Sequence, residues 1–472
     1  MNVFDEANVR RAMEDVTPER IDPNTFHDAG NAERVLRQYG EDLLYCDERN
    51  KWLVWDGKRW IADTAKARFL AKQSMLTFLQ RGIDVNDQAA QRFARQSLDE
   101  RRIDGMLGLA CIEPWIRVSA DKLDARKDLL NVRNGTLDLR TGELRAHDRS
   151  DLLTKQVHHD YDPAAECPQW DAFLERIMGA REDEDRATRL IAYLRRALGY
   201  SLSGDTSERA VFILYGDGRN GKSTLLNVFK SIVSEYAVTI AAETLMTRQQ
   251  QDNNTSSDLA DLHGARFAQT SETEEGQRFA QGKLKRITQG SGSQIRACRK
   301  YENPFSFEES HKLWVDTNHK PVIQNAEDQA LFGRLHPIPF TVQIPEAEID
   351  RELAGKLLSE APGILAWAVR GGVERYRYGL GQPKEVRQAN QEWRQESDRL
   401  SEFIEECCAT DPEIKVQASV LYRAYSEWAD ANREHPLTST AFGRKMISRS
   451  FERDKTREGW FYRGIGIRSR AF

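Results

Sequence analysis

The sequence predicts an α/β fold in three parts: a mixed α and β amino-terminal region, a central α/β core, and a small carboxy-terminal domain of helices and strands. Three observations predict it. Between residues 207 and 340, short apolar runs alternate with helical stretches, as in a sheet with crossover connections. A glycine-rich loop follows the first of these runs. Three short amphipathic stripes and a strand pair close the chain.

The composition restricts the class of protein. The chain has 472 residues and a net charge of −5, so it is long enough for about three domains and does not coat nucleic acid over its whole surface. Its six cysteines lack the spacing of a zinc site, and no apolar stretch is long enough for a membrane span. Because residues 1–20 are charged, we expect neither a secretory signal nor a lipid anchor.

The amino-terminal region is expected to comprise a tail, residues 1–25, and a mixed α and β segment, residues 26–205. Helical stretches at 65–81 and 187–198 flank short aromatic strands. Asp56-Gly57 lies between two apolar runs and predicts a tight hairpin, and Asn134-Gly135 predicts a second. Both hairpins are interpreted as scaffold.

The core, residues 206–345, contains the pattern G-x-x-x-x-G-K-[ST] between a predicted strand, Val211–Tyr215, and a predicted helix. Glycines let backbone N–H groups surround phosphate oxygens, the lysine neutralises them, and the serine hydroxyl can ligate Mg²⁺. The sequence therefore predicts a site for ATP and Mg²⁺. Its candidate residues are Gly216, Gly218, Asn220, Gly221, Lys222, Ser223 and Thr224.

Three further features of the core complete the expected catalytic set. An acidic run follows a predicted strand; we expect Glu272 to hold the metal and Glu274, or alternatively Glu275, to orient the attacking water. Asn318 follows another strand, where its amide can sense the γ-phosphate. Arg334 is the candidate for the cation that stabilises the transferring phosphoryl group.

A basic stretch lies between the acidic run and Asn318. Residues 283–301 contain no acid and have Gly290-Ser291-Gly292-Ser293 at their centre, which predicts a flexible loop that neutralises phosphates of single-stranded DNA. A solvated surface loop is the alternative. The candidate DNA-binding residues are Lys283, Lys285, Arg286, Arg296, Arg299 and Lys300.

The remainder is expected to form a helical segment and linker, residues 346–398, and a compact domain, residues 399–472. Three helical stripes precede a strand pair at Trp460–Tyr462 and Ile465–Ile467, the outline of a winged helix-turn-helix. Residues 444–470 carry nine basic and three acidic residues, a local net charge of +6. This end is therefore a candidate contact for duplex DNA or a protein, with a solubilising charged face as the alternative.

Taken in order, these motifs resemble those of superfamily-3 helicases of the phage/plasmid primase–helicase group, a branch of the AAA+ ATPases. The resemblance rests on the phosphate loop, the acidic cluster, Asn318-His319-Lys320-Pro321 and Arg334. It extends to phrases outside the core, which are Trp52-Leu53-Val54-Trp55-Asp56-Gly57-Lys58-Arg59-Trp60, Asn134-Gly135-Thr136-Leu137-Asp138-Leu139, Tyr161-Asp162-Pro163 and Cys167-Pro168. It covers about residue 26 to the end.

This resemblance implies an ATP hydrolase that moves on DNA. Lys222 and Ser223 would carry Walker A, Glu272 and Glu274 Walker B, Asn318 the sensor, and Arg334 an arginine finger that acts on a neighbouring subunit. It implies a homo-hexameric ring with single-stranded DNA in its channel, 3′ to 5′ movement, and a place in the replication of a phage, plasmid or mobile element in the cytoplasm of a bacterial host.

Only about 25 residues precede the matching region, so we expect primase activity or replication initiation to come from a separate partner protein. Two other functions remain open at this stage. One is an AAA+ helicase loader, which remodels a protein without separating strands. The other is an origin-binding scaffold whose ATP site fixes its assembly state. Stimulation of ATP hydrolysis by bare single strands would favour the helicase over both.

Overall fold

The fold is described from a computed structural model over residues 21–247, 257–270, 278–299, 303–323, 326–432, 436–449, 451–456 and 459–468. The chain divides into two compact units. Unit 1 comprises residues 1–321 and 334–387, and unit 2 comprises residues 322–333 and 388–472. In the described part of the chain, no helix combines the length and apolar character needed to cross a membrane.

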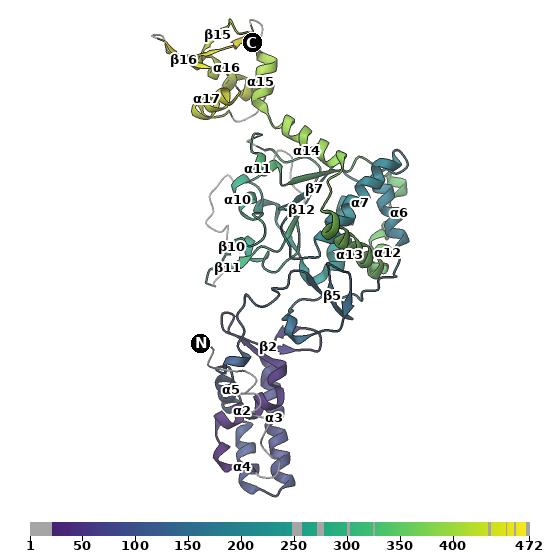
Figure 1. Cartoon of the computed structure of the whole chain (residues 1–472), viewed down its shortest axis with the longest axis vertical. Coiled ribbons are helices and arrows are strands. Elements are labelled where there is room, and N and C mark those ends of the chain that lie inside the picture. Colours follow the sequence, from purple (N-terminus) through teal and green to yellow (C-terminus); the bar gives the residue numbers. More distant parts are fainter. Residues whose placement is uncertain are drawn as a thin grey trace. The chain divides into compact units, whose positions relative to one another are not determined.

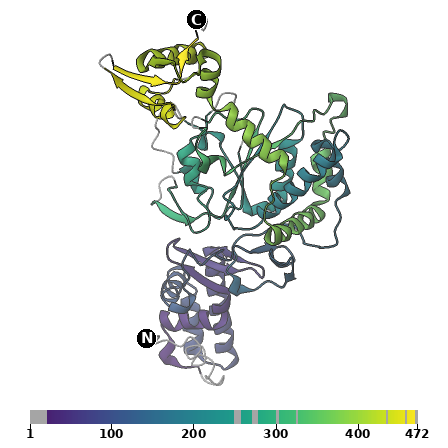
Figure 2. The ribbon, with the colours of Figure 1, turned by 45° about the horizontal axis from the view of Figure 1, so that its top comes forward.

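Unit 1 begins with a helical group and a small antiparallel sheet, drawn in purple in Figure 2. The hairpin expected at Asp56-Gly57 is confirmed, because β2 and β3 pair in the order β1-β2-β3. The elements of this part are η1 (Pro23–Thr25), α2 (Asp28–Tyr39), η2 (Gly40–Asp42), β1 (Leu43–Cys46), β2 (Lys51–Trp55), β3 (Trp60–Ala62), α3 (Thr64–Asp84), α4 (Gln88–Ser97), α5 (Glu100–Ala110) and η3 (Pro114–Ile116).

A second antiparallel sheet, β4-β5-β6, and two helices follow. The hairpin expected at Asn134-Gly135 is also confirmed, with β4 paired to β5. Trp170 is fully buried in the main core, where its ring meets Trp367 edge to face at 5.8 Å. The elements are β4 (Leu129–Val132), β5 (Gly135–Asp138), β6 (Leu144–Arg145), η4 (Arg149–Asp151), α6 (Pro168–Met178) and α7 (Glu184–Tyr200).

A five-stranded parallel sheet forms the centre of unit 1, in the order β13-β7-β12-β9-β8. The first strand along the chain, β7, thus lies between the last two, β12 and β13. Parallel strands covered on both faces read as continuous apolar runs, as β7 does; β12 is buried throughout but has an apolar run only at its centre, Leu313–Val315. The strands are β7 (Val211–Tyr215), β8 (Ala237–Ile240), β9 (Phe267–Thr270), β12 (Lys312–Thr317) and β13 (Leu335–Pro339).

Helices and a hairpin connect these strands. An antiparallel pair, β10 and β11, is inserted between β9 and β12. The connecting elements are α8 (Lys222–Val233), η5 (Ser234–Tyr236), η6 (Ala242–Thr244), α9 (Ser257–Ala260), α10 (Gln281–Arg286), β10 (Gln294–Ala297) and β11 (Phe305–Glu308). After the sheet come η7 (Glu346–Glu348), α12 (Leu353–Ser359) and α13 (Ala361–Tyr378).

Helices α7 and α13 lie side by side in unit 1 (Figure 1). Their backbones touch, because a Cβ built on Gly199 would lie 2.2 Å from the backbone nitrogen of Gly372. Only glycine permits this approach. Helix α13 is therefore integral to unit 1, so the boundary expected at residue 346 does not coincide with a boundary between the two compact units.

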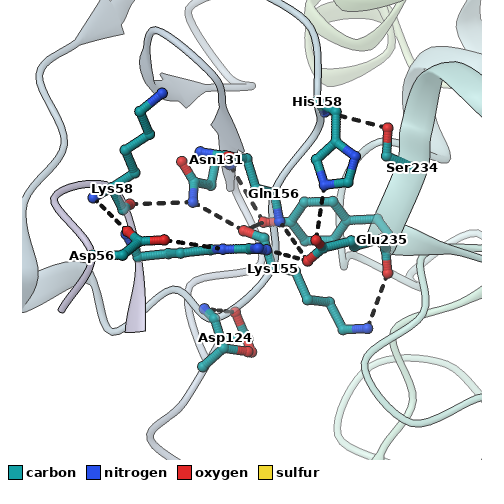
Figure 3. A network of polar contacts seen from close by, with 12 residues as sticks. Asp56, Lys58, Asp124, Asn131, Lys155, Gln156, His158, Ser234 and Glu235 are labelled. Atoms are coloured by element: carbon teal, nitrogen blue, oxygen red, sulfur yellow. Dashed lines mark hydrogen bonds and ion pairs between the residues drawn. The ribbon is translucent and has the colours of Figure 1, made fainter. Parts of the chain in front are cut away.

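A polar network joins the amino-terminal strands to the end of α8 (Figure 3). Glu235, in η5 directly after α8, forms an ion pair with Arg59. Its Oε1 also forms a hydrogen bond with His158 Nε2 at 2.8 Å. Lys155 Nζ donates to the backbone oxygen of Glu235 at 3.0 Å. The Tyr236 hydroxyl donates to the Lys155 oxygen at 3.1 Å. These contacts fix the end of α8 against the segment that follows β4–β6.

Unit 2 is organised around a separate apolar core that includes Phe403, Tyr425, Trp428 and Tyr462. Its sheet has the order β15-β17-β16, and β14 pairs with β18. The elements are α11 (Gln329–Phe332), α15 (Arg399–Cys407), β14 (Cys408–Ala409), β15 (Lys415–Gln417), α16 (Ala418–Ala431), α17 (Ser439–Ser448), β16 (Arg453–Thr456), β17 (Gly459–Arg463) and β18 (Gly466–Ile467); α14 (Lys384–Glu396) begins in unit 1 and continues into unit 2.

Two expectations for this end of the chain are corrected. The strand at 460–462 does not pair with the one at 465–467: β17 pairs with β16, and β18 pairs with β14. Gly464, at φ 81°, redirects the chain between the two strands. The part of segment 346–398 expected as a linker contains helix α14, whose buried residues Val386, Ala389 and Trp393 are spaced as one helical face.

Candidate nucleotide-binding site

The glycine-rich loop joins the carboxyl end of β7 to the first turn of α8, as its pattern predicts. Gly216 (φ 141°) and Gly221 (φ 85°) both occupy the left-handed region. A Cβ on Gly216 would lie 2.1 Å from the Phe340 oxygen, and one on Gly221 would lie 2.6 Å from Ile177 Cγ2. Gly218 is exposed, with open space where its Cβ would lie. Two glycines thus shape the loop, and the third leaves its outer edge open.

Lys222 lies at the start of α8 and is buried, with 3% of its surface exposed. Its Nζ donates to the Gly216 oxygen at 2.7 Å, to Asn220 Oδ1 at 3.1 Å and to Asn318 Oδ1 at 3.2 Å. Asn318 directly follows β12, the neighbour of β7. The structure therefore brings together the lysine, the loop amide and the predicted sensor amide from two adjacent strand ends.

Asp316 also lies at this site, although the sequence analysis did not select it. The Ser223 hydroxyl donates to Asp316 Oδ2 at 2.5 Å, and the aspartate is buried near the carboxyl end of β12. Asp316 stands opposite Leu214 of β7, one residue from the strand end. A carboxylate directly after the apolar run Leu313–Val315 and two residues before Asn318 was the signal that could have identified it.

The residues present fit a nucleoside triphosphate with Mg²⁺. The loop is narrow enough that a Cβ on either shaping glycine would collide with protein atoms, and its lysine faces the loop oxygens. A hydroxyl and a carboxylate, Ser223 and Asp316, supply the hard oxygen ligands that Mg²⁺ prefers. Within the described ranges, no group of three or more His, Cys, Asp or Glu side chains forms a metal cluster. Few protein ligands are expected where phosphates supply the others.

The predicted Walker B acids Glu272 and Glu274, and the alternative Glu275, lie outside the described residues. The strand before them, β9, is the other neighbour of β12. Its last two residues, Gln269 and Thr270, each bury a side-chain oxygen that has no hydrogen-bond partner. Polar atoms at this strand end suit a water-filled, ion-binding edge of the sheet.

Arg334 lies at the opposite edge of the sheet from the phosphate loop. Its backbone oxygen accepts from the nitrogen of Val211, the first residue of β7, whereas the loop follows Tyr215, the last. At about 3.3 Å per residue, Val211 and Tyr215 lie ~13 Å apart along β7. The Arg334 side chain donates from Nε to the Thr288 oxygen at 3.0 Å. The backbone of Arg334 therefore lies at the end of β7 away from the phosphate loop.

The predicted basic loop is largely ordered as α10 and the β10 strand. Lys283, Lys285 and Arg286 lie on α10, Arg296 lies on β10, and Arg299 follows β10; Lys300 lies outside the described residues. The Gly-Ser turn is anchored: the Gly292 nitrogen donates to Glu308 Oε1 at 2.9 Å, and the Gly290 nitrogen to Glu309 Oε2 at 3.0 Å. The expectation of a flexible hinge is corrected, because Glu308 at the end of β11 and Glu309 directly after it fix this turn.

Exposure alternates along this hairpin. Ile295 and Ala297 are buried, whereas Arg296 and Arg299 are exposed and Arg286 is exposed on α10. His263 meets the rings of Phe305 and Phe307 edge to face at 5.6 and 5.3 Å. The β10–β11 hairpin therefore packs through its apolar residues and exposes Arg296 and Arg299 to solvent.

Comparison with known proteins finds three matching segments along the chain. Residues 32–179 match the family described as D5 N terminal like. Residues 214–334 match a family of unknown function (DUF5906), and residues 395–463 match the family described as Poxvirus D5 protein-like. The second segment contains the phosphate loop, Asp316, Asn318 and Arg334.

Viral proteins named as helicases are among the relatives. Putative helicase L207/L206 of Acanthamoeba polyphaga mimivirus is 25% identical over 329 residues, 66% of this chain and 34% of that protein. Putative helicase 022R of Frog virus 3 (isolate Goorha) is 25% identical over 295 residues, 58% of this chain and 30% of that protein. Putative helicase 121R of Invertebrate iridescent virus 3 is 24% identical over 342 residues, covering 66% and 36%.

This chain spans about a third of the length of these relatives. Among solved structures, the A form of the NrS-1 C-terminal region without ligand is similar at a TM-score of 0.46 and 10% identity, covering 90% of this chain and 96% of that one. The chain is thus similar in separate segments to D5-like families and, at low identity, to viral proteins named as putative helicases.

Proposed function

We propose that this protein is an ATP-dependent DNA helicase or translocase of the superfamily-3 type. One observation carries the proposal: Lys222 Nζ lies 3.2 Å from Asn318 Oδ1, so the phosphate-loop lysine and the sensor amide meet where two neighbouring parallel strands end. In open α/β sheets, ligands bind at the carboxyl ends of strands. The similarity to proteins named as putative helicases supports DNA as the second substrate.

Each residue of the site has a distinct task in this proposal. When bound, ATP supplies the phosphoanhydride bond whose hydrolysis drives movement. Lys222 exchanges its contacts with loop oxygens for the β and γ phosphates. Ser223 and Asp316 hold the Mg²⁺ ion directly or through water, and Asn318 contacts the γ-phosphate and orients the attacking water. Glu272 and Glu274 stay predictions for metal binding and water activation.

A ring is proposed for the working form, with a hexamer as its expected size. Arg334 is placed at the sheet edge opposite its own phosphate loop, which suits an arginine finger that acts on the neighbouring subunit. The exposed cations of α10 and β10 would then face single-stranded DNA in the channel. Movement from 3′ to 5′ and a separate primase or initiation protein as partner complete the proposal.

We further propose that residues 399–472 form a winged helix. The element order α15, β15, α16, α17, β16 and β17, with a three-stranded antiparallel sheet, supports this assignment. The match of residues 395–463 to Poxvirus D5 protein-like sequences overlaps most of this segment and supports treating it as one unit.

The test is steady-state ATP hydrolysis by the purified chain with Mg²⁺, in the presence and absence of long single-stranded DNA. We expect single strands to stimulate hydrolysis. Lys222→Ala should lower the rate of hydrolysis ~10²-fold or more, because the buried cation that neutralises phosphate is lost. Lys230→Ala, at the other end of the same helix, is the matched control. Hydrolysis that is indifferent to DNA would contradict the motor and favour a loader or scaffold.

A further inference from the structure

The hairpin of β16 and β17 exposes an aromatic ring between cations. Trp460 is 43% exposed and pairs across the hairpin with Lys455, and Arg453 pairs with Tyr462. The Arg453 guanidinium carbon lies 4.6 Å from the Trp460 ring centroid, and Lys455 Nζ lies 5.7 Å from it. Both cations and the ring belong to one face of the hairpin, since cross-strand partners share a face.

This face continues onto α17. Tyr462 is buried on the same face, and a Cβ built on Gly443 of α17 would lie 3.2 Å from the Tyr462 hydroxyl and 3.8 Å from Arg453 Nη1. The base of the hairpin is thus packed against α17, while its tip with Trp460 extends to solvent. The cations are therefore presented from a rigid support.

Two basic residues near the end of α17, Lys445 and Arg449, lie close to acidic residues of unit 2. Arg449 forms ion pairs with Asp398 and, at 3.1 Å, with Glu327. Burial lowers the pKa of Lys445, which lies near the same two acids. Arg449 and Lys445 are therefore engaged within unit 2, whereas Arg444 of α17 and the two hairpin cations Arg453 and Lys455 are exposed.

We infer that the β16–β17 hairpin is a contact surface for duplex DNA, in which Arg453 and Lys455 bind backbone phosphates and Trp460 packs against the groove wall. Two cations separated by one residue on an extended strand lie about 7 Å apart, which matches adjacent phosphates of one strand. A two-stranded ribbon fits a DNA groove.

Two features favour a duplex over other occupants. Proteins that bind single strands use several stacking aromatics in succession, whereas the described part of this hairpin exposes one large aromatic, and Arg453 already lies over its ring. A protein partner is disfavoured by Lys455, the cross-strand neighbour of Trp460, because lysine is depleted at protein–protein interfaces.

The test is fluorescence anisotropy of the full chain with a short labelled duplex and, separately, with one of its strands. We expect Arg453→Ala with Lys455→Ala to weaken duplex binding ~10- to 100-fold at low salt and to reduce the slope of log K against log[salt] by about 2. Trp460→Ala should weaken it ~10-fold, with partial recovery in Trp460→Phe. Arg423→Ala, an exposed arginine on α16, is the control and should change neither quantity.

Duplex binding that survives the double substitution, or a wild-type chain that binds no duplex, would overturn the inference. Weakening confined to the single strand would also overturn it and assign the hairpin to that ligand. ATP hydrolysis stimulated by long single strands should be unchanged in all hairpin variants, so failure of the inference and failure of the proposed function give different results.

Discussion

The hydroxyl of Ser223 donates a hydrogen bond to the buried carboxylate of Asp316, with 2.5 Å between the oxygens. This contact joins the first turn of α8 to the end of β12, so it links the loop that would hold phosphates to the strand that carries Asn318. A serine hydroxyl and a carboxylate at this position form one oxygen pair for a divalent cation.

Replacement of Asp316 by Asn should therefore affect metal use more than nucleotide binding. We expect Asp316→Asn to lower kcat for ATP hydrolysis by ~10²-fold and to raise the Mg²⁺ concentration needed for half-maximal rate, because a negative ligand becomes neutral. Titrating Mg²⁺ at fixed ATP measures both. Asp261→Asn, at an exposed position after α9, is the control. An unchanged Mg²⁺ requirement would limit Asp316 to packing.

Arg334→Ala should inhibit wild-type subunits when the two proteins are mixed. In the proposed ring, each altered subunit would lack the cation that acts on a neighbour's site, so it should inactivate that site. ATP binding should be retained, and hydrolysis should fall more steeply than the fraction of wild-type protein. Arg351→Ala, exposed before α12, serves as the charge-matched control. A linear decrease with mixing ratio would contradict an interface site.

Removal of cations from α10 and the β10–β11 hairpin should uncouple DNA from hydrolysis. With Lys285, Arg286 and Arg299 changed to Ala, we expect DNA stimulation of ATP hydrolysis to disappear while the basal rate persists, because phosphate contacts are lost outside the nucleotide site. A variant lacking the exposed Arg92 and Arg95 of α4 removes similar charge elsewhere. Retained stimulation would place the DNA contact on another surface.

Breaking the ion pair between Arg59 and Glu235 should destabilise unit 1. Glu235→Gln removes the charge that Arg59 and His158 share, and we expect a loss of about 1–3 kcal/mol in the free energy of unfolding. Urea denaturation of the single variants and of the double variant with Arg59→Met gives the coupling between the two sites. Additive effects would show that the pair contributes no specific stability.

Acid should destabilise the protein through its buried histidines. Burial lowers the pKa of His336 to about 4 and of His311 to about 3, from an ordinary value of 6.5. Both are neutral when folded and take up a proton on unfolding. Their contribution to stability is therefore fully present above pH 6.5 and is lost as the pH falls toward 4 and then 3.

Urea denaturation between about pH 5 and 8 tests this expectation, with a slope of up to about 1.4 kcal/mol per pH unit for each histidine. In His336→Gln, the slope below pH 6.5 should decrease by the share of one histidine. The glutamine can retain a hydrogen bond to Gln382, which contacts the ring at 2.9 Å in the native protein. An unchanged slope would show that other groups dominate acid unfolding.

The geometry of the site could be predicted from the sequence where residues close together along the chain determine it. The loop from Gly216 to Gly221 is fixed by glycine conformations and by its place between a strand and a helix, so its pattern was enough. The two hairpins at Asp56-Gly57 and Asn134-Gly135 were likewise encoded by turn residues.

Long-range relationships were not accessible in the same way. Asp316 contacts Ser223 only because β12 pairs with β7, strands about 100 residues apart. The Gly290–Ser293 turn was predicted to be flexible because its anchors lie elsewhere in the sequence, Glu308 at the end of β11 and Glu309 directly after it. At the end of the chain, β17 pairs with β16 and not with β18. The chain changes direction at Gly464, between β17 and β18, and the sequence alone did not reveal this.

Helix α8 has 12 residues, so it is about 18 Å long and behaves as a stiff rod. Its first residue is the phosphate-loop lysine, and Glu235, just beyond its last residue, is clamped by Arg59 and by Lys155. The contacts of Glu235 therefore link the amino-terminal region to the phosphate loop through this one helix.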